Sequence, residues 1–422
     1  MISKFILWHK KVIKRIVIIV ILIIMALIAC ERIYNSSAKF QTIAEDAGYY
    51  GILDARFTSK EKLKDFDYLY EFLKENYPFY KVNERINNEN WLDNKRDYRR
   101  ILKNANGDAE YLIAISNILQ DLNDKNTYVL TGDTYRRFYM YYYPDLPKAL
   151  YGFRATARYD FNGDISNIEL DPNNNLIYHN GPVLETKILI ENELAYLKIK
   201  AMAYNHIEED YPKIKNFLKN VEKYDKIILD IRGNAGGFDE YWQNIVELLI
   251  NDVHSAKYYS FFKQNSKSTL DDYQVSNIYT IRDLDDNILN GFPDEIRTDF
   301  NFYKTNLIEI FSNNDVNFKG NVYLLVDREV YASAEKFAAF AKDTGFATVV
   351  GETTGGGMTF EEVPMISMPY GGFLVRYSRE MVMNSDGTIN METKTIPHIV
   401  VDNPIPDEEF SKDECIQAVI ED

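Results

Sequence analysis

Residues 227–237 read Ile-Ile-Leu-Asp-Ile-Arg-Gly-Asn-Ala-Gly-Gly, and this stretch decides the fold. Its apolar start predicts a strand buried on both faces, because a strand with one wet face would alternate apolar and polar residues. The glycines that follow predict a tight turn, and Asp239 to Ile250 has the apolar spacing of a helix. Strand, turn and helix in this order form a β-turn-α unit, from which parallel sheets are built.

The same order of elements returns later in the chain. Strands are expected at 322–326 and 347–350, with a helix over 333–342 between them. Two such units predict an α/β fold with a largely parallel, two-sided sheet. The segment 252–315 between the units is polar, aromatic and charged, so we expect an inserted lobe there.

Three further segments complete the predicted organisation. Residues 59–130 carry apolar residues at helical spacing and predict an N-terminal helical region. Residues 131–205 predict a strand-rich middle segment, in which the tyrosine-rich stretch 138–143 is either a buried strand or a recognition surface. The core itself is assigned to residues 206–410, with a hairpin around 369–372.

Composition limits the class of protein and its partners. A chain of 422 residues with 46% hydrophobic and 14% aromatic residues indicates a globular protein with more than one structural unit. Lys and Arg number 48 against 64 Asp and Glu, and five of the basic residues precede residue 16, so the body is strongly acidic. Such a field repels phosphate backbones and excludes nucleic acid as a partner. Two cysteines are too few for a disulfide or zinc framework.

The N-terminus indicates the compartment. A basic stretch through Arg15 precedes the apolar run Ile16–Ala29, which as a helix would cover about 21 Å of a hydrocarbon core of about 30 Å. That length favours a signal peptide over a spanning helix. Leu-Ile-Ala-Cys at 27–30 resembles the lipobox of bacterial lipoproteins, which implies cleavage before Cys30 and lipid attachment to its thiol.

An uncleaved anchor is the alternative for residues 1–30, and residues 31–58 are expected to be a tether. Under either reading the body lies on the extracytoplasmic face of the cell membrane, or is secreted.

Two segments have the composition of a reactive site. The turn 232–237 comes between a buried strand and a helix, where backbone N–H groups converge on an anion or an oxyanion; a merely compact turn is the alternative. Ser333 stands at the mouth of the second helix, where it is either an N-cap or a nucleophile.

Three stretches together resemble the tail-specific, or C-terminal-processing, serine peptidase family. They are Leu-Asp-Ile-Arg-Gly-Asn-Ala-Gly-Gly at 229–237, Leu-Val-Asp-Arg-Glu-Val-Tyr-Ala-Ser-Ala-Glu at 325–335 and Val-Val-Gly-Glu-Thr-Thr-Gly-Gly at 349–356. The resemblance spans residues 60–402 and is to the tricorn-like branch, without an obvious PDZ module. It implies a Clp protease/crotonase-like core, polypeptide substrates, and no metal or organic cofactor.

The catalytic positions implied by the resemblance are substituted. The family's nucleophilic Ser corresponds to Ala332, and Ser333 comes one residue later, about 100° around a helix. The base of the tricorn-like branch is a His at the position of Asn126, whose amide cannot accept a proton. The base of the other branch is a Lys, at a position that Gly357 holds counted from Ala332 and Met358 counted from Ser333.

The remaining candidates follow from that resemblance. Ser333 is the candidate nucleophile, with the amides of Gly236, Gly237 and Ala334 as oxyanion donors. Glu392 corresponds to the acidic residue that orients the tricorn-like site. The histidines left as bases outside the signal region are His179, His206, His254 and His398.

Three functional hypotheses remain. The first is a membrane-attached serine peptidase that cleaves extracytoplasmic polypeptides. The second is a catalytically lapsed homologue that binds or scaffolds peptides. An acyl-thioester enzyme of the crotonase kind is disfavoured, because an acidic body outside the cytoplasm neither attracts nor meets a phosphate-rich coenzyme.

Overall fold

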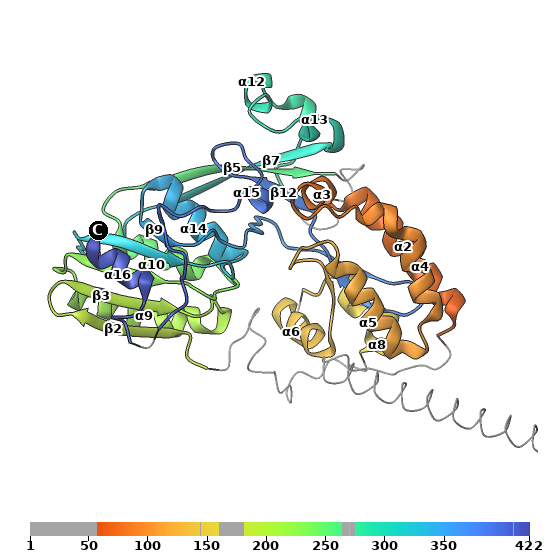
Figure 1. Cartoon of the computed structure of the whole chain (residues 1–422), viewed down its shortest axis with the longest axis horizontal. Coiled ribbons are helices and arrows are strands. Elements are labelled where there is room, and N and C mark those ends of the chain that lie inside the picture. Colours follow the sequence, from red (N-terminus) through yellow and green to blue (C-terminus); the bar gives the residue numbers. More distant parts are fainter. Residues whose placement is uncertain (1–56, 144, 160–180, 264–269, 271–274, 408) are drawn as a thin grey trace, which may run out of the picture.

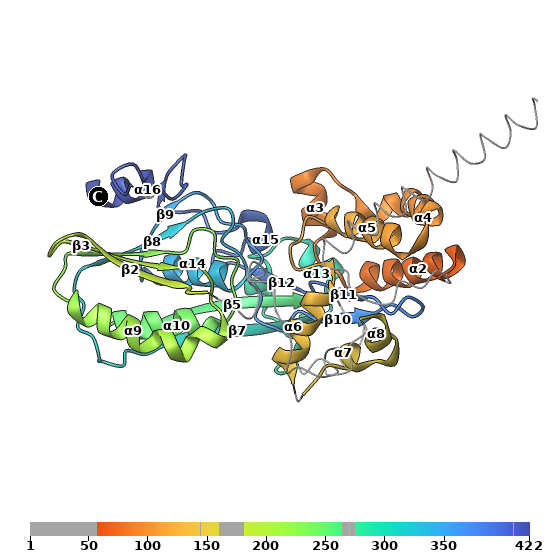
Figure 2. The same ribbon diagram turned by 90° about the horizontal axis from the view of Figure 1, so that it is seen from below.

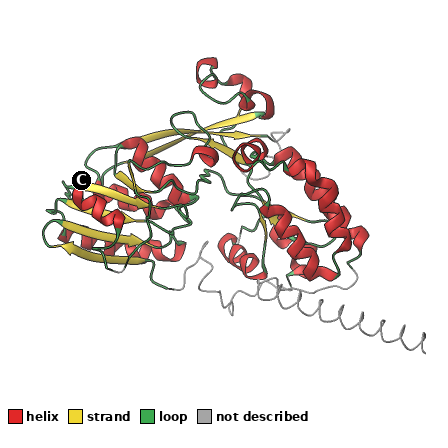
Figure 3. Cartoon of the chain, viewed as in Figure 1, coloured by secondary structure: helices red, strands yellow, loops and turns green. Residues whose placement is uncertain are grey.

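The computed structural model describes residues 57–143, 145–159, 181–263, 270, 275–407 and 409–422. Within them the largest sheet has six strands in the order β13-β9-β8-β4-β3-β2 (Figures 1 and 3). All neighbours pair in parallel except β2 and β3, so the predicted α/β fold with its largely parallel sheet is confirmed. The strands are β2 (Leu184–Ile190), β3 (Leu194–Ile199), β4 (Lys226–Asp230), β8 (Asn321–Val326), β9 (Thr348–Gly351) and β13 (Ile399–Val400).

Strand β4 is buried on both faces, which explains its unbroken apolar run. Ile227 and Leu229 belong to one apolar cluster and Ile228 to another, and none of the three is accessible to solvent. The first cluster includes residues of α9 (Ile207–Asn220), α10 (Asp239–Leu249) and α14 (Ser333–Thr344). The second includes α16 (Glu414–Glu421), which Figure 2 shows on the opposite side of the sheet from α9 and α10.

A buried ion network ties the C-terminal helix to the glycine turn. Arg232 donates from Nη2 to Oδ2 of Asp230 at 2.7 Å and to Oδ2 of Asp413 at 2.8 Å. Asp413 in turn caps α16 by accepting from the amides of Cys415 and Ile416. The Arg232, Asp230 and Asp413 side chains are at most 1% exposed, so their charges are balanced within the protein rather than by water. Asp230 also accepts from the Tyr196 hydroxyl at 2.7 Å.

The N-terminal region is helical, as expected. Its first helix begins at a capping box, in which Thr58 and Glu61 each accept from the other's backbone amide. Apolar residues of these helices form one core that also holds residues of the later strands. The elements are α2 (Ser59–Asn76), α3 (Tyr80–Asn87), η1 (Trp91–Asn94), α4 (Lys95–Asn104) and α5 (Gly107–Gln120).

Two smaller sheets connect the helical region to the core (Figures 1 and 2). The order β12-β5-β7-β6 comprises β12 (Glu380–Met383), β5 (His254–Phe262), β7 (Phe302–Ile310) and β6 (Tyr279–Thr280). The order β1-β11-β10 comprises β1 (Tyr128–Val129), β11 (Leu374–Arg376) and β10 (Met365–Ser367), with the predicted hairpin between β10 and β11.

The expected insertion at 252–315 therefore begins and ends in paired strands. Its short elements η3 (Ile281–Asp283), α12 (Asp286–Leu289) and α13 (Glu295–Asp299) lie between β6 and β7 in the chain. Figure 1 shows α12 and α13 projecting beyond the β5 and β7 strands.

The prediction of a strand-rich segment over 131–205 is wrong for its first part. Residues 132–158 form α6 (Gly132–Tyr142), α7 (Lys148–Tyr151) and α8 (Phe153–Arg158). Thr131 caps α6 by accepting from the amide of Thr134, and Tyr135 and Phe138 are buried on one side of the helix. The buried aromatic residues therefore have helical spacing. Large aromatic residues are also common in strands, which is why the sequence favours a strand here.

The predictions for the N-terminus concern residues outside the described ranges. They are the signal peptide or anchor at 1–30, lipid attachment at Cys30, and the tether up to residue 56. Among the residues that the structure does describe, no helix is both long and apolar enough to cross a bilayer.

Candidate active site

The second β-turn-α unit places Ala332 at a strained position. Ala332 has φ of 52° and ψ of −116° directly before α14. This is the left-handed half of backbone space that glycine usually fills, the mirror image of the first central residue of a type II turn. The surrounding structure holds this strained conformation in place. The Ala332 amide donates to the carbonyl of Gly356 at 3.2 Å, and the Ala332 carbonyl accepts from the backbone amide of Lys336 at 2.9 Å.

The glycine turn of the first unit packs directly on that junction. A Cβ at Gly236 would lie 2.8 Å from the carbonyl oxygen of Tyr331 and 2.9 Å from the nitrogen of Ser333. A Cβ at Gly237 would lie 2.2 Å from the carbonyl oxygen of Met202. Both positions therefore require glycine, because the backbones approach too closely for a Cβ.

The candidate oxyanion donors differ in whether their N–H groups are already hydrogen-bonded within the protein. The amide of Gly236 donates to Asn234 Oδ1 at 2.9 Å, and that of Ala334 donates to the Tyr331 carbonyl at 3.1 Å. Among the described residues, the amides of Gly237 and Ser333 have no hydrogen-bond partner. The pair of amides left for a ligand is thus Gly237 and Ser333.

Asn126 reaches the same place from the N-terminal region. Asp124 accepts from the Asn126 amide at 2.9 Å and from the Tyr331 hydroxyl at 3.1 Å, so one carboxylate joins the loop to the residue before Ala332. The Asn126 side chain accepts from Arg376 Nη1 at 3.1 Å. The side-chain oxygen of Asn126 therefore already accepts a hydrogen bond from a charged donor.

Ser333 is engaged in a polar cluster. Its hydroxyl donates to Oδ1 of Asp239, at the first position of α10, at 2.6 Å. Oδ2 of Asp239 accepts from the ammonium of Lys336, one turn further along α14. Ser333 is the first residue of α14 rather than its N-cap, and its side chain makes no cap hydrogen bond. We call Ser333, Asp239 and Lys336 the serine cluster.

One cavity of about 580 Å³ contains these groups. We call it the site cavity. Lys125, Asn126, Phe138 and Tyr141 line it from the N-terminal region, and the other lining residues come from the core. The core residues are Ala235, Gly237, Phe238, Asp239, Tyr331, Ala332, Ser333, Lys336, 359–363 and Arg376.

A buried acid, Glu335, follows Ser333 by two residues in α14. Glu335 is inaccessible to solvent, and its Oε1 accepts from Asn390 at 2.7 Å and from the Thr395 hydroxyl at 2.8 Å. Its Oε2 has no hydrogen-bond partner among the described residues. Burial raises the pKa of this carboxyl to about 7.

The structure does not bring the predicted bases to Ser333. His398 accepts at Nδ1 from the Val349 amide at 2.9 Å, and burial lowers its pKa. His206 lies 3.9 Å from Asp210, and Glu392 pairs with Arg85. None of the histidines in the described ranges lines the site cavity, and His179 lies outside those ranges.

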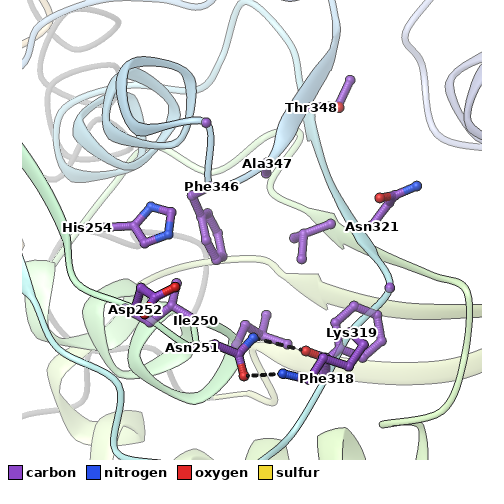
Figure 4. Close-up of a pocket in the computed structure, with 14 residues that line it drawn as sticks. Ile250, Asn251, Asp252, His254, Phe318, Lys319, Asn321, Phe346, Ala347 and Thr348 are labelled. Carbon is purple, nitrogen blue, oxygen red and sulfur yellow. Dashed lines mark hydrogen bonds between the residues drawn. The ribbon is translucent and has the colours of Figure 1, made fainter.

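His254 belongs to a second cavity of about 370 Å³, at the start of strands β8 and β9 (Figure 4). Its ring meets that of Phe346 edge to face, with centroids 6.3 Å apart. Across the cavity Lys319 donates to Asn251 Oδ1 at 3.0 Å. Strand β8 begins in this cavity and leads to the site at its other end, so His254 is separated from Ser333 by the length of the sheet.

Three residues of the site were not predicted from sequence. From sequence, Asp239 is identified only as the start of a helix, and Lys336 and Arg376 are not singled out. Asp239 is a neighbour of Ser333 only in three dimensions. The one sequence signal was the spacing of Ser333 and Lys336, which places both on one helix face.

Comparison with known proteins agrees with this fold. The sequence pattern of peptidase family S41 matches residues 193–401. Among solved structures, a peptidase of Parabacteroides merdae is 17% identical with a TM-score of 0.55, covering 85% of this chain and 96% of its own. Mature CPAF complexed with lactacystin is 12% identical with a TM-score of 0.52, covering 81% and 94%. No match was found among curated proteins.

The fold and the site segments thus define the class, and the chain belongs to peptidase family S41. The resemblance of its motifs to the tail-specific peptidases is confirmed at this level, together with the mixed α/β fold and its N-terminal helical region.

Proposed function

We propose that this protein binds extended polypeptide segments in the site cavity and that hydrolysis by the usual route of its family is lost. The observation that carries the proposal is Ala332, which has a strained backbone conformation and offers only a methyl group at the position that the resemblance assigns to the nucleophile. Nothing in the cavity walls depends on the replaced hydroxyl, so peptide capture is separable from cleavage.

The cavity has the chemistry that a peptide backbone needs. Phe138, Tyr141 and Phe360 supply apolar walls, and the amides of Gly237 and Ser333 are donors for a peptide carbonyl. Peptidase family membership supports a polypeptide as the ligand.

Substitution of both catalytic positions predicts a large loss of rate. A site that keeps oxyanion donors and binding but has no activated nucleophile is expected to be about 10⁴–10⁶-fold slower than an intact one. Asn126 adds to this loss because its amide oxygen is bonded to Arg376 and has no proton affinity near neutral pH.

The second candidate is slow hydrolysis by the serine cluster, and the 2.6 Å contact between Ser333 and Asp239 favours it. In this reaction Asp239 accepts the hydroxyl proton while Ser333 Oγ bonds to the peptide carbonyl carbon. The leaving amine takes that proton as the C–N bond breaks, and water then hydrolyses the ester. The other oxygen of Asp239 accepts from Lys336, and a carboxylate is a weak base for a serine hydroxyl, so the step is slow.

We also propose that the body is attached to the extracytoplasmic face of the membrane through the lipidated thiol of Cys30. The lipobox-like sequence at 27–30 supports this. A Cys30→Ala variant should lose lipid incorporation and membrane fractionation. Unchanged migration and fractionation would contradict lipidation.

Binding and cleavage can be measured on one sample. The full chain is titrated with a fluorescent, permanently unfolded polypeptide, anisotropy reports binding, and electrophoresis of the same mixture reports cleavage. We expect saturable binding with an intact polypeptide. Thr359→Trp, which fills the cavity, should weaken binding at least about tenfold, and Thr305→Trp on β7 should not.

Cleavage abolished by Ser333→Ala would instead establish the second candidate. Equal affinity of Thr359→Trp and the unsubstituted chain would overturn binding in this cavity.

A further inference from the structure

One surface of the helical half combines exposed aromatic rings with basic side chains. We call it the aromatic–basic face. Phe153 is 87% exposed and Tyr151 51%, which is unusual for rings of this size in an ordered helix. The face consists of Tyr151, Phe153, Tyr370, Lys64, Lys148 and Arg154.

Contacts hold the three segments of this face together. Lys64 donates to the Tyr370 hydroxyl at 3.0 Å and lies 4.8 Å from its ring centroid. Arg154 donates to the Tyr370 carbonyl at 2.9 Å and lies 5.9 Å from the same ring. Helices α2 and α8 and the β10–β11 hairpin therefore present one continuous surface, and Figure 2 shows α7 and α8 beside β10 and β11.

The charge of this region is opposite to that of the whole chain. The face carries three exposed basic residues, Lys64, Lys148 and Arg154, although the chain has a net charge of −16. The nearby Arg137 and Arg158 are buried and paired with acids, so they add nothing to this surface. The acids that act on Arg154 are Glu61, which Lys64 also faces, and the buried Asp65. Because the face keeps its cations exposed, it suits an anionic partner.

The chain preceding the described residues arrives beside this face. Phe57 is the first described residue, and its ring lies 5.1 Å from that of Tyr111 and 6.3 Å from that of Phe373. Phe373 belongs to the same hairpin as Tyr370. The 56 residues before Phe57 include the apolar run 16–29 and Cys30, the proposed attachment site.

We propose that the aromatic–basic face docks on the surface of an anionic bilayer, with Phe153 and Tyr151 at the headgroup level and Lys64, Lys148 and Arg154 against lipid phosphates. This inference rests on the proposed membrane attachment. Aromatic rings favour the membrane interface, and basic side chains near an anionic surface add attraction. An N-terminal attachment that ends at Phe57 keeps the face at a high effective concentration near the bilayer, so weak contacts suffice.

Depth-dependent quenching tests the proposal. The full chain is reconstituted in vesicles containing phosphatidylglycerol, and an environment-sensitive fluorophore is placed at Phe153→Cys or, as the matched control, at Phe311→Cys, which is 66% exposed beyond β7. Cys415 is buried, and burial raises the pKa of its thiol to about 12, so it resists labelling.

Spin-labelled lipids should quench the label at position 153 several-fold more than the label at position 311. Lys64→Glu with Arg154→Glu should reduce quenching at position 153 toward the control level, and Lys319→Glu, at the second cavity, should leave it unchanged. High salt or uncharged lipid should act like the double substitution.

Vesicle flotation separates this proposal from the attachment on which it rests. Flotation with equal quenching at both positions would overturn docking and leave attachment standing. A chain that does not float would overturn attachment through residues 1–30 and docking with it.

Discussion

The hydroxyl of Ser333 lies 2.6 Å from a carboxylate oxygen of Asp239, a residue 94 positions earlier in the chain. The two residues begin the helices of the two β-turn-α units, so the contact exists only when both units share one sheet. The same contact decides how Ser333 acts. Its hydroxyl is held by a carboxylate whose other oxygen is paired with Lys336, and no imidazole is within reach among the described residues.

Introducing the nucleophile and base that the family resemblance implies should produce hydrolysis. Ala332→Ser with Asn126→His is expected to cleave an unfolded polypeptide, and each single variant should be about 10²–10⁴-fold slower than the double variant. Both positions line the site cavity, and Arg376 beside the introduced imidazole favours its neutral, proton-accepting form. A double variant that folds but does not cleave the polypeptide would mean that the geometry of the site has changed as well as its chemistry.

The strain at Ala332 should be measurable. Ala332→Gly removes a positive-φ penalty of about 1–3 kcal/mol at a cost of about 1 kcal/mol in backbone entropy. We expect a gain of about 1 kcal/mol in the free energy of unfolding, determined from urea midpoints. Ala334→Gly, two residues into the same helix, is the control and should destabilise by about 1 kcal/mol or more.

Gly236 and Gly233 offer a matched pair in the site turn. Both have positive φ, but a Cβ at Gly233 meets nothing within 4 Å, whereas at Gly236 it meets backbone at 2.8 Å. Gly233→Ala should cost about 1 kcal/mol and leave polypeptide affinity unchanged. Gly236→Ala should cost more and weaken binding, because the glycine turn must move away from Ser333. Equal effects of the two would contradict the close approach.

Stability should fall as pH rises because of Glu335. Its pKa is about 7 in the folded protein and 4.5 when exposed, so the folded state holds the proton more tightly. Its neutral form contributes fully below about pH 4.5, and that contribution, up to roughly 3 kcal/mol, declines as pH rises toward and beyond 7.

Glu335→Gln isolates this contribution. The amide keeps an oxygen for Asn390 and Thr395 and places its NH₂ where Oε2 has no partner. The urea midpoint of the variant minus that of the unsubstituted protein should therefore rise from pH 5 to pH 8. A difference that is constant with pH would contradict a neutral buried carboxyl.

Removal of a partner from the Arg232 network should be costly. Asp413→Ala leaves the buried guanidinium with one carboxylate and α16 without its cap, and we expect a loss of about 3–5 kcal/mol. Glu409→Ala breaks the exposed Glu409–Lys412 pair nearby and should cost less than about 1 kcal/mol. Similar thermal midpoints for both variants would contradict the network's role.

The sequence predicts the parallel core well because burial on both faces of β4 leaves an unmistakable apolar run. The glycine turn and the start of α14 follow from local chemistry in the same way. Residues 132–142 were misassigned because large aromatic residues suit either a strand or a buried helix face, and only packing of Tyr135 and Phe138 decides. The partners of Ser333 could not be predicted, since Asp239 and Lys336 meet only through the relative placement of two helices.

The buried Arg232 network has a consequence for biosynthesis. Asp413 follows Arg232 by 181 residues, so during synthesis Arg232 is made long before its second carboxylate. Until then Arg232, which opens the glycine turn, has one of its two carboxylates and no docked α16. A nascent or truncated chain that stops before Asp413 therefore carries an unfinished glycine turn, which the docking of α16 completes.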